Sequence, residues 1–267
     1  MAGGAVVHER RSRGPRLGRV DRTKLARWVL SIALFFVLWE LLGQSGAFIA
    51  IVPPSLVLPD LWQEILHGEI LAATFGTLSN AAIAFVIGAV LGVTFGAILG
   101  VSKRWSDVFD PIVSASFSVP VSMFIPLIAV YFGLEVRSKV ILIVLFNIFV
   151  IIINTATGIR EVPAQVIEMA RAFEVNRSGL YRHVILPWAS PYIITGLRIG
   201  LGRSVQGAIL ADLFFRTQNL GLVIRNAAGT FDMSQLLGSV FFITIIAAGT
   251  MGLARIVEWR LLRWKTG

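Results

Sequence analysis

Six long apolar runs constrain the fold of this chain more than any other feature. An α-helix needs about 20 mostly apolar residues to cross the hydrocarbon core of a bilayer. Only 15% of the 267 residues are charged, against about 25% in soluble domains. The sequence therefore predicts an all-α, polytopic membrane bundle. The six predicted transmembrane helices are residues 25–42, 79–101, 108–132, 139–159, 192–215 and 236–257.

The Lys and Arg residues between these runs lie almost entirely on one side. With the N-terminus placed inside, 17 of them fall in cytoplasmic segments and four in outer loops, and such an asymmetry orients membrane proteins. Both termini are therefore predicted to be cytoplasmic. We expect residues 1–27 to be a basic, disordered tail attracted to anionic lipid head groups, not to nucleic acid. Residues 28–267 are predicted to form one transmembrane domain.

The first apolar run has an alternative interpretation as a secretory signal peptide, since a basic leader precedes it. Glu40 interrupts the run, however, and no Ala-x-Ala cleavage site follows it. We interpret the run as an uncleaved helix and keep cleavage as the alternative.

Several kinds of catalytic and metal site require residues that this chain lacks. It has no cysteine, and its three histidines, His8, His67 and His183, are too scattered to form a metal cluster. It has no G-x-x-x-x-G-K-[ST] motif and no Gly-Lys dipeptide, so it cannot hold ATP in a phosphate-binding loop. We expect no catalytic residue, metal or cofactor in this chain. Any energy that it uses must come from a partner protein or an ion gradient.

Glycines recur every four residues in the run at residues 79–101. Gly88, Gly92, Gly96 and Gly100 form a smooth stripe on a helix, where another helix backbone can approach closely. We interpret the stripe as packing within one subunit, and a seam between two subunits is the alternative.

Two prolines interrupt the run at residues 108–132. Pro120 and Pro126 lack a backbone N–H and should bend or break the helix. Irregular backbone at membrane depth survives only where protein or a water-filled cavity surrounds it. Residues 116–126 are therefore a candidate pathway lining, with a simple kink as the alternative. The candidate lining residues are Ser116, Ser118, Pro120 and Ser122.

Four polar side chains lie within the run at residues 192–215. Arg198, Arg203, Gln206 and Asp212 are expected to face a bundle interior, a partner or water, because charges are costly in hydrocarbon. Arg198 and Arg203 are placed near the cytoplasmic end, where they could reach lipid phosphates. Asp212 is placed nearer the outer end, where we expect it to pair with a cation of the same bundle.

The polar segment at residues 160–187 is predicted to be the last large cytoplasmic loop. Pro163 suits the first turn of a helix that continues to Phe173. Asn176 suits the N-cap of a second short helix over residues 177–184. Two short helices with a bend between them would form a rigid, charged projection into the cytosol.

This loop resembles the EAA loop of bacterial ATP-binding-cassette (ABC) importer permeases. That pattern reads E-A-A, three residues, Gly, nine residues and I-x-L-P. Glu168 matches its Glu, Ala170 its second Ala, and Leu186-Pro187 its closing pair. The spacing and the place of the loop before the fifth predicted span match as well.

The resemblance includes departures and further matches. Met169 replaces the first Ala, Val184 the Ile, and Glu174 the usual Gly, which puts the geometry of the bend in question. Residues 53–55 (P-P-S) and 196–203 (G-L-R-I-G-L-G-R) are similar to segments of the nitrate, sulfonate and taurine type of these permeases. The resemblance extends from the first span to Trp264.

The resemblance implies a type I ABC importer permease fold in the bacterial inner membrane, with residues 28–267 as the permease domain. It implies a second permease copy, two copies of a cytosolic ATPase that hold ATP and Mg²⁺, and an extracytoplasmic substrate-binding protein. The implied substrate is a small anion of the sulfonate, taurine or nitrate kind. The residues implied to couple the permease to its ATPase are Glu168, Ala170, Arg171, Ala172, Phe173, Glu174 and Asn176.

Two other functions compete with this interpretation. A secondary transporter or channel without an ATPase would be favoured by chains of acidic residues or His within the spans and by internal repeats. Asp212 is the only such residue, and no convincing repeat is present. A membrane-embedded enzyme is the third possibility, but no nucleophile, base and metal ligands cluster in the sequence.

Overall fold

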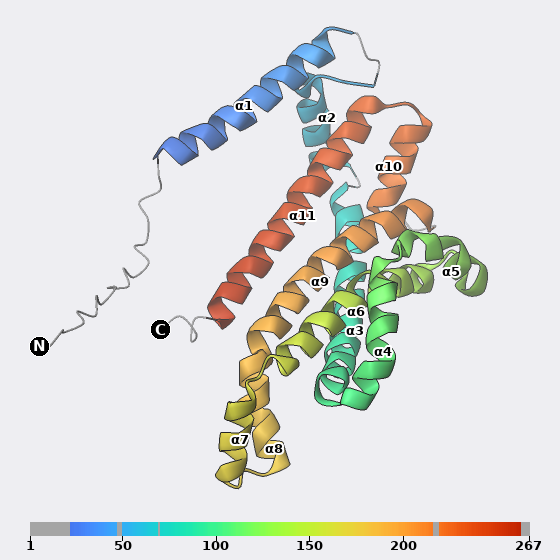
Figure 1. Cartoon of the computed structure of the whole chain (residues 1–267). Helices are drawn as coiled ribbons and strands as arrows, with labels where there is room; N and C mark the ends of the chain where they lie inside the picture. Colours follow the sequence, from blue (N-terminus) through green and yellow to red (C-terminus); the bar gives the residue numbers. More distant parts are fainter. Residues whose placement is uncertain (1–21, 47–49, 69, 216–218, 263–267) are drawn as a thin grey trace, which may run out of the picture. The chain divides into compact units, whose positions relative to one another are not determined.

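The computed structural model describes residues 22–46, 50–68, 70–215 and 219–262. Regular structure within these residues is entirely helical (Figure 1), including a 3₁₀ segment, η1, and a π segment, η2. In chain order the elements are α1 (Arg22–Gln44), α2 (Pro54–His67), α3 (Ile70–Val101), α4 (Lys103–Ser118), η1 (Val121–Phe124), α5 (Ile125–Phe132), α6 (Val136–Arg160), α7 (Ala164–Ala172), α8 (Arg177–Leu180), η2 (Tyr181–Ile185), α9 (Leu186–Phe214), α10 (Leu220–Gly229) and α11 (Met233–Leu261).

Five helical segments of the described chain are long and apolar enough to cross a membrane: α1, α3, α6, α8–η2–α9 and α11. A sixth span consists of α4 and η1–α5, which meet at 91°. The prediction of an all-α membrane bundle is confirmed, and its six spans are reached when this bent pair counts as one span. Which side each span faces stays a prediction.

Several predicted boundaries differ from the structure, among them the starts of α3 and α1. Helix α3 begins at Ile70 instead of residue 79, because the polar residues of its first turns bond within the helix: the Thr74 hydroxyl donates to Ile70 O at 2.6 Å. Residues 22–27 of the predicted tail belong to α1, and residues 1–21 lie outside the described residues.

The chain divides into two compact units after Ser55. In the first unit, the carboxylate of Glu40 accepts hydrogen bonds from the backbone N–H of Ser55 at 3.0 Å and from its hydroxyl at 2.6 Å. The indole N–H of Trp39 donates to Val52 O at 3.0 Å. The acid that interrupts the first apolar run therefore holds the start of α2, where helical N–H groups lack partners.

Helices α3, α6 and α9 form the packed core of the second unit, with α6 against both others. The four glycines of the predicted stripe on α3 all face α6. A Cβ added at Gly92 would lie 2.8 Å from Ile151 Cβ, and one at Gly96 would lie 2.7 Å from Ile152 O. The interpretation of the stripe as packing within one subunit is confirmed.

One buried amide ties the three core helices together. Asn147 of α6 is fully buried, and its side-chain NH₂ donates to Ser204 Oγ of α9 at 2.8 Å and to Ala84 O of α3 at 3.3 Å. A Cβ at Gly88 would overlap the Asn147 carbonyl oxygen. The glycine stripe therefore makes room for a polar contact as well as for close backbones.

Helix α9 continues without interruption from α8, so that Arg177–Phe214 counts as one segment of 38 residues. The prediction of a separate second helix over residues 177–184 is wrong. The backbone N–H of Leu186 donates to Tyr181 O, a π-type hydrogen bond that carries the helix past Pro187, which has no N–H to donate.

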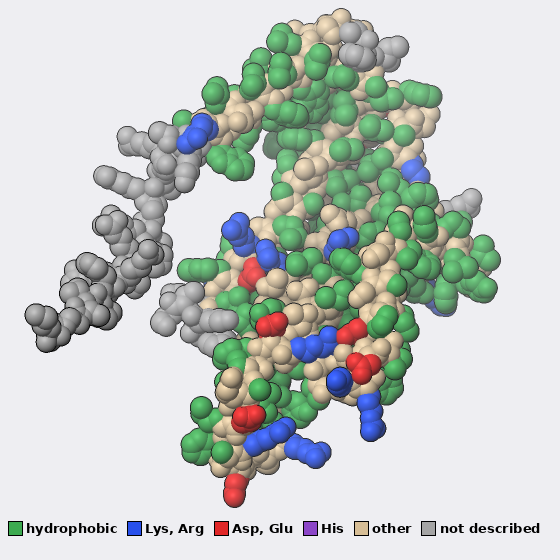
Figure 2. Space-filling model, viewed as in Figure 1, with side chains coloured by type: hydrophobic (Ala, Val, Ile, Leu, Met, Phe, Trp, Pro, Cys, Tyr) green, Lys and Arg blue, Asp and Glu red, His purple; other side chains and the backbone are tan. Residues whose placement is uncertain are grey.

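The loop helices lie at one end of the second unit, and many of the surface charges lie toward the same end. Helices α7 and α8 lie together at one end of α9, and α10 lies at the other end (Figure 1). On the face shown in Figure 2, acidic and basic side chains gather around α7 and α8, over the lower part of α4 and over the C-terminal part of α11, whereas hydrophobic side chains cover most of the rest. A hydrophobic surface of this kind suits a lipid environment.

Candidate functional site

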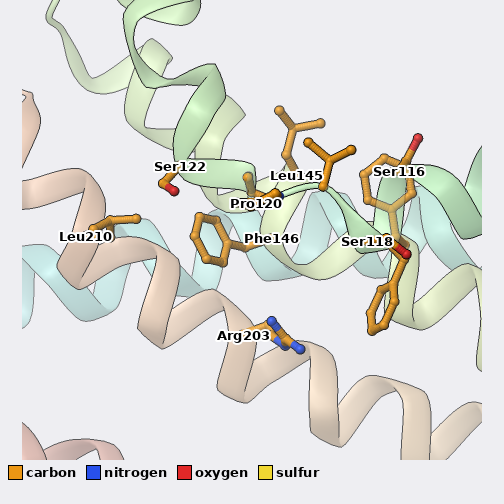
Figure 3. A pocket seen from close by; sticks show the side chains of 12 residues that line it. Ser116, Ser118, Pro120, Ser122, Leu145, Phe146, Arg203 and Leu210 are labelled. Carbon is orange, nitrogen blue, oxygen red and sulfur yellow. The ribbon is translucent and has the colours of Figure 1, made fainter.

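A cavity of about 400 Å³ lies where the broken span meets α6 and α9 (Figure 3). The four predicted lining residues, Ser116, Ser118, Pro120 and Ser122, all contribute to its wall. Their role in a pathway stays a prediction, but the structure brings all four to one cavity. The other lining residues are Phe117, Val119, Val121, Leu145, Phe146, Phe149, Arg203 and Leu210.

The cavity exists because the span breaks at Pro120, as predicted. Val119 and Pro120 are both extended, with ψ angles of 131° and 109°, since a residue before proline is biased away from the helical region. The helix restarts when Met123 N donates to Pro120 O at 3.0 Å. Pro126 does not bend the helix as predicted, because it lies in the first turn of α5, where no N–H is needed.

Arg203 is the charged residue of this cavity, and Figure 3 shows it on α9. Its guanidinium lies 5.7 Å from the centre of the Phe117 ring at the end of α4. It also lines a second cavity, of about 590 Å³, between α9 and α11. Arg203 precedes Phe214, the last residue of α9, by 11 positions, or about 16 Å. It therefore lies nearer the middle of the helix than predicted.

Arg198, one and a half turns before Arg203, has an acidic partner. Its Nε lies 2.9 Å from Glu258 Oε2 of α11. Thr195 Oγ1 donates to the other oxygen of the same carboxylate at 3.3 Å. This arginine therefore joins α9 to α11 and does not need to reach lipid phosphates.

The bend after α7 is made by Glu174, which has a left-handed backbone with φ of 53°. Val175 N donates to Ala170 O at 3.2 Å, and Glu174 N donates to Arg171 O at 2.9 Å. These two bonds define a Schellman motif, in which glycine is the favoured residue because it adopts a positive φ without strain. The usual glycine of the EAA pattern thus falls where the structure requires this conformation, and Glu174 keeps the bend.

The surface of the loop is mostly exposed. Of the seven residues implied in coupling, Ala170 is buried, with 9% exposure, and the other six are exposed. Phe173 and its neighbour Met169 are 79% and 60% exposed. Asn176 Oδ1 accepts a hydrogen bond from Gly179 N at 2.7 Å, which confirms the predicted N-cap. The helix predicted from Pro163 to Phe173 is confirmed to within one residue at each end.

The base of the loop packs into the transmembrane helices. Its buried apolar cluster joins the end of α6, the turn before α7, η2 and the start of α9. The projection is therefore anchored to the spans on both sides. The buried residues of this cluster are Ile159, Val162, Ile185 and Ala189.

An ion pair that the sequence did not reveal joins the loop-side end of α6 to α4. The two guanidinium NH₂ groups of Arg160 lie 2.8 and 2.9 Å from the two oxygens of Asp110, and one of them also donates to Leu99 O at 3.1 Å. Ser106 Oγ donates to the same carboxylate at 2.8 Å. Nothing in the local sequence pairs Arg160 with a residue 50 positions earlier.

A second ion pair, Lys139–Asp212, is fully buried at the other end of α6 and α9. Thr77 Oγ1 of α3 donates to Asp212 at 2.5 Å, and Asn219 Nδ2 lies 3.4 Å from the same carboxylate. The expected cationic partner of Asp212 is therefore confirmed. The sequence did not identify this partner, because Lys139 lies at the very start of the predicted span 139–159 and counts among the four cations of the outer loops. The one signal in the sequence for this pair is that Lys139 and Asp212 are opposite charges within two apolar runs.

Comparison with known proteins gives a consistent result. The family model described as "Binding-protein-dependent transport system inner membrane component" matches residues 88–261. The putative aliphatic sulfonates transport permease protein SsuC of Bacillus subtilis (strain 168) is 32% identical, over 87% of this chain and 85% of its own. The riboflavin transport system permease protein RibX of Chloroflexus aurantiacus is also 32% identical, over 88% and 89%.

More distant matches agree. The nitrate import permease protein NrtB of Synechocystis sp. (strain ATCC 27184 / PCC 6803 / Kazusa) is 27% identical, over 91% of this chain and 90% of its own. A solved chain from the inward-facing MetNI methionine ABC transporter superposes with a TM-score of 0.63 at 18% identity, over 75% of this chain and 97% of that one. The latter likeness concerns the fold alone.

Proposed function

The chain belongs to the family of binding-protein-dependent transport system inner membrane components, and we propose that it forms the translocation pathway of an ATP-driven importer for a small anion. As a member of this family, it is a multi-pass inner-membrane transport subunit. The observation that carries the proposal is the cavity beside the broken span, which brings the predicted lining residues together with Arg203.

The pathway follows this cavity. A broken helix exposes backbone groups that hydrocarbon cannot satisfy, so it belongs beside water or protein. Three serines and one arginine line the cavity among apolar side chains, and a few polar groups in an apolar wall are typical of small-molecule sites.

A second permease copy completes the pathway in this proposal. Ser118, Pro120, Ser122 and Arg203 are all exposed in the single chain, although they lie in membrane-spanning segments. An arginine near the middle of a span is costly unless protein or water covers it. A homodimer that places these surfaces against each other removes that cost.

The loop at residues 160–187 binds the ATPase. Its tip presents the exposed Met169 and Phe173 beside Glu168 and Arg171, and an apolar centre with a charged rim suits a protein–protein interface. Two ATPase copies, one for each permease loop, would hold the ATP and Mg²⁺ that this chain has no phosphate-binding loop to bind. Their closure would move the loops and open the pathway to alternate sides.

The proposed orientation places the loop and both termini in the cytoplasm, with the basic residues before α1 as a tail against anionic lipids. The uneven distribution of Lys and Arg supports it. The substrate would then arrive from an extracytoplasmic binding protein, as the description of the family suggests. A reporter fused after Gly229 should be found outside the cytoplasm, and a cytoplasmic signal would contradict the orientation.

The proposed substrate is a small anion. Relatives are named for aliphatic sulfonates, nitrate and bicarbonate, and the cavity contains a cation. A neutral organic molecule is the second candidate, because a relative named for riboflavin matches at the same 32% identity. Arg203 favours the anion.

Uptake and ATP hydrolysis in reconstituted vesicles, with the ATPase and the binding protein, test the coupling. Glu168→Lys and Phe173→Asp should lower both activities at least about tenfold, because each forces a charge into a desolvated interface. Ala170→Asp is less informative, because Ala170 is buried within the loop itself. Glu135→Lys, an exposed charge reversal before α6, is the control.

Full activity in both loop variants would refute the coupling role. Uptake that proceeds without any ATPase would instead indicate a secondary transporter or channel.

A further inference from the structure

We propose that Arg203, held by Phe117, forms a binding site for a single oxyanion group, such as a sulfonate, nitrate or carboxylate, inside the cavity of the broken span. The inference rests on the proposed function, because it assigns the substrate contact of that pathway. Arg203 supplies the charge, and Phe117 positions the guanidinium.

Arg203 differs from three other cations of α6 and α9. Arg160, Arg198 and Lys139 each have a carboxylate partner. No carboxylate among the described residues lies within 4.0 Å of the Arg203 guanidinium. Its charge is therefore available to an external anion.

Phe117 holds this guanidinium at the cavity. The ring lies at the end of α4, directly before the break, and its centre is 5.7 Å from Arg203 Cζ. A cation within about 6 Å of a ring face is attracted to it. The contact uses no N–H group, so the planar fork of five donors stays free to bind two oxygens of one anion.

The broken span provides neutral donors. Ser118 donates its hydroxyl to Ser114 O at 3.1 Å, so it has no proton left for a ligand. Ser116 and Ser122, which line the same cavity, are not engaged in this way among the described residues. Leu145, Phe146 and Leu210 make the rest of the wall apolar, and a low local dielectric strengthens the attraction between a cation and an anion.

The experiment uses the charge of a thiol reagent as the probe. The chain has no cysteine, so Ser118→Cys introduces one thiol beside Phe117. The full-length permease in lipid nanodiscs is treated with two methanethiosulfonates that differ only in the end group, an ethylsulfonate or an ethyltrimethylammonium. Arg203→Gln should lower the ratio of anionic to cationic modification rates about threefold to tenfold, by loss of the local positive potential.

A second measurement separates binding of an anion at Arg203 from the general electrostatic attraction of the charged reagent. Millimolar nitrate or methanesulfonate, compared with equal ionic strength of a bulky hydrophilic anion, should slow modification by a neutral methanethiosulfonate. The protection should be lost in Arg203→Gln and partly retained in Arg203→Lys. Arg182→Gln removes an exposed charge from η2 and should leave both measurements unchanged.

The outcomes are distinct. If neither nitrate nor methanesulfonate protects the thiol, the site is overturned, even if the rate ratio falls. Protection that survives Arg203→Gln also overturns it. These assays need no ATPase, so their failure with intact ATP-coupled uptake overturns the site alone. Loss of ATP dependence in the unmodified importer overturns the proposed function. A misfolded Arg203→Gln is recognised by its elution profile, and Arg203→Lys then provides the comparison.

Discussion

Helices α3, α6 and α9 pack through glycines and exclude space, whereas the broken span of α4, η1 and α5 meets α6 and α9 around a cavity. Both regions contain apolar stretches, although α4 begins with the charged residues Lys103, Arg104, Asp107 and Asp110. Glycines let two backbones approach closely, and Pro120 prevents one continuous helix from filling the same volume. The placement of glycines and of Pro120 thus separates a closely packed frame from a wall that leaves a cavity. Four predictions test this contrast.

The largest effect is expected where the frame contains charge. Lys139→Met leaves Asp212 buried without its cation, and removal of one partner of a buried ion pair costs about 3–5 kcal/mol. The apparent melting temperature of the purified permease should fall steeply. The double variant Lys139→Met/Asp212→Leu should recover part of the loss. Equal stability of the single variant and the unmodified chain would show that this end of the frame is loosely packed.

The glycine contacts should be nearly as sensitive. Gly96→Ala places a Cβ 2.7 Å from the backbone oxygen of Ile152, and overpacking of this kind costs about 1–3 kcal/mol. Gly249→Ala on α11 is the matched control, since no atom lies within 4 Å of its new Cβ. Thermal unfolding should separate the two variants. If both are tolerated alike, the close approach of α3 and α6 is not required.

Water should enter the broken span but not the frame. Single cysteines at Ser116, Ser118 and Ser122 should react with a water-soluble thiol reagent at rates that change severalfold between nucleotide states of the importer. Thr155→Cys, fully buried on α6, should stay unreactive in every state. If the three serine positions also stay unreactive, the break is a packed kink and lines no pathway.

The smallest effect is a gain in stability. Glu174→Gly removes the strain of a left-handed glutamate, which amounts to about 1 kcal/mol. Replacing a glycine of α3 is expected to destabilise the core, whereas introducing a glycine at residue 174 should stabilise the bend after α7. A slightly higher melting temperature with unchanged ATP-coupled uptake is expected. Lower uptake at normal stability would show that the Glu174 carboxylate itself contacts the ATPase.

The fold was largely readable from the sequence. The lengths of the apolar runs predicted six spans. The four-residue spacing of Gly88 to Gly100 predicted the face of α3 that packs, and Pro120 predicted the break in the third span. Asn176 gave a helix start. Each of these depends on residues that are close in sequence, so local stereochemistry decides the outcome.

The pairs that join distant segments were not readable in the same way. Asp110 with Arg160, and Lys139 with Asp212, come from helices whose rotation and neighbours the sequence does not specify. Helix continuity through Pro187 also escaped prediction, because one π-type bond rescues a position where proline normally ends a helix. The four candidate lining residues could be grouped by sequence, but Arg203 lies 81 positions beyond Ser122 and joined them only in three dimensions.

The continuous segment Arg177–Phe214 has a mechanical consequence. Beyond η2, one α-helix carries both Arg203 at the cavity and Asp212 in the buried ion pair, nine positions or about 14 Å apart. The two residues therefore lie on one continuous helix, and a rotation of α9 about its axis turns both through the same angle. Any rotation that the loop transmits through η2 therefore reaches the cavity and the buried Lys139–Asp212 pair together, so the two cannot change independently.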